Sequence, residues 1–237
     1  MVPWVHEALK DVVGVDAQLL EDLATVRDAA LRDHLAALAA LDDAARILEG
    51  AQLPWMVVKG PALAYTIYAR PDLRDYGDLD LVVRREDFGD VLDAFEVQGY
   101  PSLVADWDLL RERGAAQVQV RMRHSIADVH WHLLHWSRVR EAVTIDMDAL
   151  FSRRRMVDVA GRPVPTLDPV DTVLHLALHA ATSGGLRLIW LEDIEQAVAT
   201  DELDWDELVR RADETGMRLV AAVMLRRSRR VLGADVP

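Results

Sequence analysis

The chain has 237 residues, 51% of them hydrophobic, and a formal net charge of −13 at pH 7. This length can bury the core of one large domain or two small ones, whereas the negative charge argues against a long nucleic-acid groove, which needs Lys and Arg to neutralise phosphates. The chain has no cysteine, no N-terminal signal pattern and no apolar run of the roughly 18 residues that a membrane helix needs. These absences exclude disulfide scaffolds, thiolate metal sites and membrane helices, and they predict a cytoplasmic protein.

The first hundred residues alternate helical and strand patterns. Leucine and alanine recur at helical spacing in the N-terminal part until Gly50, which is a stop signal. Gly60 then suits a turn and Pro61 suits the first position of a helix. The predicted elements are a helix over 16–50, a strand over 55–58, a helix over 61–69, a strand over 78–83 and a helix over 86–98.

The second half of the chain begins with alternating strand patterns and ends in helices. The predicted elements are strands over 117–123 and 126–133, a hairpin over 156–166, and helices over 168–182, 186–200, 204–215 and 217–232. We therefore predict an α/β (α+β) fold, with a mixed sheet flanked by helices. The predicted units are an N-terminal helical segment over 1–50, a central domain over 51–167 and a C-terminal helical domain over 168–237.

Two acids open the predicted strand over 78–83. Side chains alternate along a strand, so Asp78 and Asp80 project from the same face. Two carboxylates this close stay ionised together mainly when a cation lies between them. Asp128 in the strand over 126–133 offers a third carboxylate. Hard oxygen ligands suit Mg²⁺, and a carboxylate cluster that positions two such ions is a common arrangement for phosphoryl transfer.

A lysine and a glycine mark the turn after the first predicted strand. Lys59 is one of only two lysines in the chain. Gly60 permits close backbone approach, and the first N–H groups of the next helix point at whatever binds there. A nucleotide phosphate would bind well, and Lys59 would add a point charge. Arg70 and Arg74 lie on the connection to the next strand and are candidates to hold the outer phosphates.

Histidines support an alternative interpretation. The histidines of the stretch HWHLLH are His130, His132 and His135. Two histidines in phase with Asp128 on one strand suit a transition metal, so a His-based metallohydrolase is an alternative. His175 and His179 share a helix face. They are either ligands of a zinc site or buried, hydrogen-bonded histidines. Asp193 lies in a mostly apolar helix and would reach a cleft between domains or offset a neighbouring charge.

A strand, a glycine turn, a helix and Asp-x-Asp at the next strand form a recognisable unit. It reads VVKGPALAYTIY followed by RPDLRDYGDLDLVV, and Asp128 with His130, then GRPVPTLDPVDTVLHLALHAA and LRLIWLEDI, come later in order. The unit resembles the polymerase-β-like nucleotidyltransferase superfamily, in particular an uncharacterised bacterial nucleotidyltransferase family and the minimal nucleotidyltransferases of abortive-infection toxins. The resemblance covers roughly residues 50–200. It departs at the turn, where many members have Gly-Gly or Gly-Ser and this chain has Gly-Pro.

The resemblance implies a metal-dependent transferase, with its catalytic domain over 51–167. An NMP would move from an NTP, expected to be ATP, to an acceptor hydroxyl, and pyrophosphate would leave. Asp78 and Asp80 would bind both Mg²⁺ ions, and Asp128 would hold the catalytic ion and help to deprotonate the acceptor. The acceptor stays open among a small molecule, a peptide and a protein, and the negative charge disfavours a tRNA end. An alternative from another class is a non-catalytic helical interaction module whose acids lie only on the surface.

Overall fold

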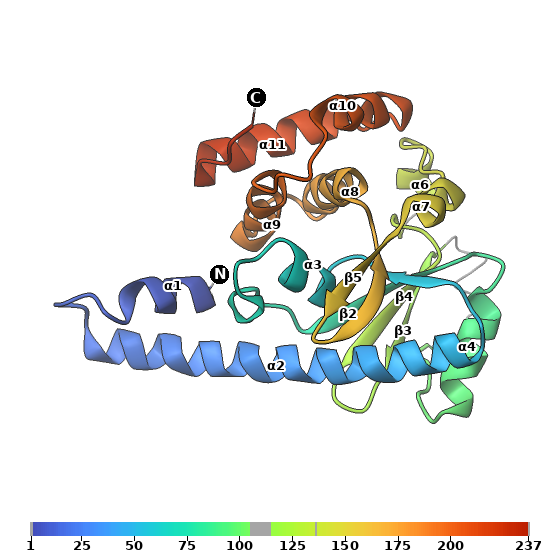
Figure 1. Cartoon of the computed structure of the whole chain (residues 1–237), viewed down its shortest axis with the longest axis horizontal. Coiled ribbons are helices and arrows are strands. Elements are labelled where there is room, and N and C mark those ends of the chain that lie inside the picture. Colours follow the sequence, from blue (N-terminus) through green and yellow to red (C-terminus); the bar gives the residue numbers. More distant parts are fainter. Residues whose placement is uncertain (1, 105–114, 136, 237) are drawn as a thin grey trace.

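The computed structural model describes residues 2–104, 115–135 and 137–236. A mixed β-sheet lies between the long helix α2 and a group of C-terminal helices (Figure 1). The strands are β1 Trp55–Val57, β2 Asp78–Val83, β3 Gln117–Arg121, β4 Ile126–His130, β5 Arg155–Val159 and β6 Arg162–Thr166. Their order in the sheet is β3-β4-β2-β1-β6-β5. Parallel pairs (β2 with β4, β1 with β6) and antiparallel pairs occur together, so the predicted mixed sheet is confirmed.

Helices cover the sheet and extend beyond it. The helices are α1 Val2–Leu9, α2 Ala17–Gly50, α3 Pro61–Thr66, α4 Phe88–Val97, α6 Ser137–Arg140, α7 Met147–Arg153, α8 Pro169–Thr182, α9 Leu188–Val198, α10 Trp205–Glu214 and α11 Arg218–Leu232, and a 3₁₀ turn η1 covers Pro71–Leu73. Helix α2 begins after Asp16, whose side chain accepts a hydrogen bond from the Leu19 N–H at 2.9 Å. No helix within the described residues is long and apolar enough to cross a bilayer.

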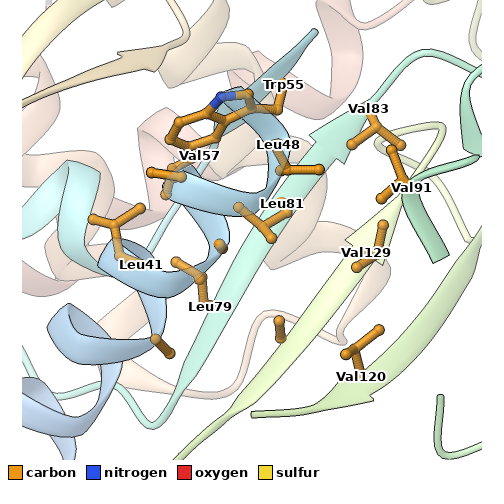
Figure 2. Close-up of a cluster of buried hydrophobic side chains, with 14 of the residues drawn as sticks. Leu41, Leu48, Trp55, Val57, Leu79, Leu81, Val83, Val91, Val120 and Val129 are labelled. Atoms are coloured by element: carbon orange, nitrogen blue, oxygen red, sulfur yellow. The ribbon is translucent and has the colours of Figure 1, made fainter. Parts of the chain in front are cut away.

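The main core lies between α2 and one face of the sheet. Leu41 and Leu48 of α2 point toward Leu79 and Leu81 of β2 (Figure 2), and all four are at most 2% exposed. Burial of large aliphatic side chains stabilises this layer by about 1.5–3 kcal/mol each. Strand side chains alternate, so the acids of β2 face away from α2, toward the C-terminal helices. This one hydrophobic pattern therefore decides which face of the sheet carries the polar residues.

A second hydrophobic cluster joins the C-terminal helices to each other and to α3. It contains Leu63 of α3 together with buried residues of α8, α9, α10 and α11. Helix α8 begins after Asp168, whose side chain accepts a hydrogen bond from the Asp171 N–H at 2.7 Å. The predicted C-terminal run of helices is thus confirmed, and the domain boundaries near 50 and 167 stay predictions.

Several element boundaries differ from the prediction. Strand β4 ends at His130 rather than at 133, because the chain bends over residues 131–133, although the Trp131 N–H still donates to the Ala116 carbonyl at 3.0 Å. Helix α3 ends at Thr66, three residues before the predicted end at 69. The helices α1, α6 and α7 were not predicted. The hairpin of β5 and β6 lies where the sequence placed it.

Candidate active site

The parallel pairing of β2 with β4 brings the acids of the two strands together. Asp80 lies directly opposite Asp128 in the register, and Val82 lies opposite His130. Ligand atoms of Asp80, Asp128 and His130 all lie within 4.8 Å of one another. The expectation that the two strands are neighbours is therefore confirmed. His130 is the third member of this group, and metal binding by Asp78, Asp80 and Asp128 stays a prediction.

Asp80 is the buried centre of the site. It is 2% exposed, and its Oδ1 lies 3.0 Å from Lys59 Nζ and 3.2 Å from His130 Nε2. Burial alone would raise the pKa of this carboxyl, but the Lys59 ammonium and the His130 hydrogen bond outweigh it and hold the pKa of Asp80 well below its usual value. Asp80 is therefore an ionised carboxylate inside the protein.

Asp78 precedes Asp80 by two residues on β2, Asp128 lies opposite Asp80 on β4, and both are more exposed than Asp80. Asp78 begins β2 at the solvent-exposed end of the strand. Desolvation, followed by the negative charge of Asp80, raises the pKa of Asp78 above its usual value. Asp128 is half-buried, and its Oδ1 accepts a hydrogen bond from Gln119 Nε2 at 2.9 Å. Negative charge thus accumulates along this strand pair, and Lys59 offsets part of it.

The turn before α3 requires a glycine. Gly60 has φ of 51° and ψ of −122°, a conformation that residues with a Cβ rarely adopt. A Cβ at this position would lie 3.2 Å from the carbonyl oxygen of Asp78 and 3.4 Å from the Tyr76 ring. The backbone of the turn therefore approaches the start of β2 closely, and contact of Gly60 with a phosphate stays a prediction.

Replacing Gly60 with alanine should lower the free energy of unfolding by about 1–3 kcal/mol, because the new Cβ strains the backbone and contacts the Asp78 carbonyl. Thermal unfolding followed by circular dichroism measures this. Gly89→Ala is the control, since no atom lies within 4 Å of a Cβ there and the residue lies in helix α4. The control should melt at or above the wild-type temperature. Equal melting temperatures for Gly60→Ala and the wild type would contradict the backbone strain assigned to this position.

Arg74 ties the turn to the C-terminal helices. Its guanidinium forms two hydrogen bonds of 2.8 Å with the carboxylate of Asp193 on α9, and its Nη1 lies 3.4 Å from the carbonyl oxygen of Gly60. The Tyr68 hydroxyl donates to the same carboxylate at 2.7 Å. Arg74 is 6% exposed and Asp193 is 1% exposed, so this is a buried ion pair. Asp193 therefore fixes α9 against the Gly60 turn.

Arg70 lies elsewhere. Its guanidinium binds Asp72 at 2.7 Å and Glu7 of α1 at 2.8 Å. Arg70 does not line either of the two cavities at the acids, whereas Arg74 lines one of them. Contact between either arginine and a phosphate stays a prediction.

Two cavities meet at the acids. The turn cavity, of about 450 Å³, is lined by Lys59, Gly60, Arg74, Asp75, Tyr76, Gly77, Asp78, Asp80, Gln119, Ile126, His179, Arg187, Ile189, Trp190 and Asp193. The histidine cavity, of about 320 Å³, is lined by Val58, Lys59, Asp78, Asp80, Val82, Gln117, Asp128, His130, Leu133, Leu134, His135, Val139, His175, His179, Thr182 and Ser183. Lys59, Asp78, Asp80 and His179 belong to both linings. Such a pair of cavities can hold two molecules that react across the acids.

Comparison with protein families gives one match over nearly the whole chain. The model of a family described as "uncharacterised nucleotidyltransferase" matches residues 1–233. The chain belongs to this family. Among proteins of curated function, none matches this nucleotidyltransferase.

Solved structures resemble this nucleotidyltransferase at low sequence identity. The antibiotic-resistance factor ANT(2″)-Ia in complex with adenylyl-2″-tobramycin is 14% identical, with a TM-score of 0.48 over 80% of this chain and 97% of that one. The lincosamide antibiotic adenylyltransferase LnuA, solved with lincomycin bound, is 13% identical, with a TM-score of 0.44 over 68% and 94%. An antigenic nucleotidyltransferase-like protein from Paracoccidioides brasiliensis is 15% identical, with a TM-score of 0.47 over 86% and 93%.

The histidines of this nucleotidyltransferase separate into different roles. His130 joins the acids, whereas His132 is buried and its Nδ1 accepts a hydrogen bond from the Leu134 N–H at 3.0 Å. His132 and His135 stand outside the group of metal-capable residues found in the described chain. The sequence suggested His130 and His132 as ligands in phase with Asp128 because it continued the strand to 133. The end of β4 at His130 removes that alternation.

Proposed function

We propose that this nucleotidyltransferase moves an NMP from an NTP, with ATP as the expected donor, to an acceptor hydroxyl and releases pyrophosphate. The observation that carries the proposal is the proximity of Asp80, which lines both cavities, to Asp128, which lines the histidine cavity. We assign the NTP to the turn cavity, because it contains the glycine turn and Arg187. We assign the acceptor to the histidine cavity, because Asp128 lines it. A cytoplasmic location stays part of the proposal.

The residues fit a magnesium site. Asp78, Asp80 and Asp128 supply the hard carboxylate oxygens that Mg²⁺ prefers. The raised pKa of Asp78 reflects partial desolvation and repulsion from Asp80, and a bound cation would relieve that repulsion. When bound, Mg²⁺ supplies charge stabilisation to the reacting phosphates. His130 Nε2 donates to the Asp80 carboxylate at 3.2 Å and would orient it.

The chain's own residues carry the remaining steps. Asp128, oriented by Gln119, takes the proton from the acceptor hydroxyl. The oxygen then attacks the α-phosphorus, the bond to the bridging oxygen breaks, and pyrophosphate carries away that electron pair. Lys59 lines both cavities and places its charge near the phosphates, and Arg187 takes the outer-phosphate role in the turn cavity.

The proposal is tested by nucleotide binding. Wild-type protein should bind a non-hydrolysable ATP analogue in isothermal calorimetry only with Mg²⁺ present. Lys59→Ala should weaken this binding by about 10–150-fold, because a charge-assisted hydrogen bond contributes about 1.5–3 kcal/mol, and should weaken adenosine binding far less. Lys10→Ala is the matched control, since Lys10 pairs with Glu7 on α1 and lines neither cavity. Binding that ignores Mg²⁺ would favour the non-catalytic interaction module.

A further inference from the structure

A histidine that the reaction above does not use lies in the wall of the histidine cavity. His175, in the middle of α8, is 5% exposed and lines this cavity. Neither of its ring nitrogens has a hydrogen-bond partner among the residues that the structure describes. An unpartnered buried polar group costs about 1–3 kcal/mol. Its neighbours on the helix are leucines, and a leucine at 175 would carry no such cost.

The neighbours of His175 do not provide the missing partners. His175 also borders a smaller cavity lined by Arg153, Asp171 and Arg211, but these charged groups pair with one another at 2.9–3.0 Å. The ring of His179 has its centroid 6.2 Å from that of His175 and packs edge-on against Trp190. No described neighbour therefore satisfies the nitrogens of His175, and the histidine cavity is the larger of these two spaces that the residue lines.

Both histidines at this wall are neutral near pH 7. Burial, followed by the charge of Lys59, lowers the pKa of His175 well below its ordinary value and that of His179 to about 4. A neutral imidazole has one N–H donor and one nitrogen acceptor, and this pair matches a hydroxyl group. The same pair gives no ionic attraction to an ammonium group.

The charges of the histidine cavity also favour an uncharged molecule over a polycation. Its carboxylates are those of Asp78, Asp80 and Asp128, all three of which we assign to metal and proton transfer. The rest of its lining is apolar, uncharged polar or histidine, apart from Lys59. No carboxylate in the described lining is left to pair with the amines of a polycationic acceptor. Its volume of about 320 Å³ is at the small end of ligand sites.

We infer that the acceptor is a small, uncharged, hydroxyl-bearing molecule with an apolar part, and that His175 binds its hydroxyl groups. This inference rests on the proposed function, since it places the acceptor in the histidine cavity. The acceptor class therefore differs from the polyamines that a more acidic cavity would select.

The first test compares two buried histidines without using any ligand. His175→Leu should raise the melting temperature or leave it unchanged, because it removes two unpartnered nitrogens. His34→Leu is the matched control. His34 is also 5% exposed, but its Nδ1 lies 2.8 Å from the Tyr76 hydroxyl, so its loss should lower the melting temperature. A fall for His175→Leu like that for His34→Leu would make His175 a structural residue and overturn the inference.

The second test uses two neutral probes, phenyl β-D-glucopyranoside and thymidine, and one polycation, tobramycin, each with Mg²⁺ and the ATP analogue. Side-chain ¹⁵N NMR should show that a neutral probe shifts the His175 nitrogens and that tobramycin does not. His175→Leu should weaken the binding of that neutral probe about tenfold or more, while the ATP analogue binds with unchanged affinity. Tobramycin binding at His175, or no neutral probe binding at millimolar concentration, would overturn the inference. Failure of the analogue to bind wild type would instead overturn the proposed function.

Discussion

Asp80→Asn should abolish nucleotidyl transfer. Asp80 is the buried carboxylate at which Lys59, His130 and both cavities meet. An amide binds a divalent cation poorly, so the variant would lose charge stabilisation of several kcal/mol, equivalent to a rate loss of about a thousandfold or more. The rate of pyrophosphate release with Mg²⁺ and ATP measures this loss.

The same variant should still fold. Lys59 is 17% exposed and can turn its ammonium to water when Asp80 loses its charge. Asp148→Asn is the control, since the Asp148 side chain is 82% exposed and pairs with Arg84 on the surface. It should keep the wild-type rate. Full activity of Asp80→Asn would show that the acids of β2 do not serve catalysis.

Asp193→Ala should destabilise the protein strongly. The substitution leaves the Arg74 guanidinium buried without its carboxylate partner and also removes the acceptor of the Tyr68 hydroxyl. Breaking one side of a buried ion pair costs about 3–5 kcal/mol. For a chain of this length that corresponds to a fall in melting temperature of roughly 6–20 °C. Differential scanning calorimetry of the metal-free protein measures it.

A double variant separates the unpaired charge from other effects. Replacing the pair with Arg74→Met and Asp193→Leu removes both charges and fills a similar volume, so it should recover most of the lost stability. If Asp193→Ala has the same melting temperature as the wild type, the ion pair does not stabilise the packing of α9 against the Gly60 turn. If the double variant stays as unstable as Asp193→Ala, the loss arises from packing rather than from the unpaired charge.

Local pattern predicted much of the fold because the pattern itself has a physical cause. Alternation along Asp78–Val83 placed the leucines on the core side and the acids on the other, and the structure has β2 with the same bounds. The long helix was readable from leucine spacing and Gly50. Helix α1 was not predicted, because its eight residues give too few turns for a pattern. The end of β4 coincides with a bend over residues 131–133 that the alternating pattern did not signal.

The site was only partly readable for a similar reason. Alternation along the two predicted strands indicated that Asp80 and Asp128 would meet if the strands were neighbours, and the structure pairs them in register. The ion pair of Lys59 with Asp80 and that of Arg74 with Asp193 depend on packing, and 119 residues separate the members of the second. His175 looked like an ordinary core histidine in sequence. Its missing partners are visible only once every neighbour is placed.

Attack at the α-phosphorus is the central claim, and ³¹P NMR of ATP incubated with Mg²⁺ and a stoichiometric amount of protein tests it most directly. Water can replace the unknown acceptor in this slow reaction, so no acceptor has to be identified first. The account predicts that the wild type forms AMP and pyrophosphate and that the signals of both products are absent with Asp80→Asn. Formation of ADP and inorganic phosphate by the wild type, at a rate that Asp80→Asn also loses, would place the attack at the γ-phosphorus and contradict nucleotidyl transfer.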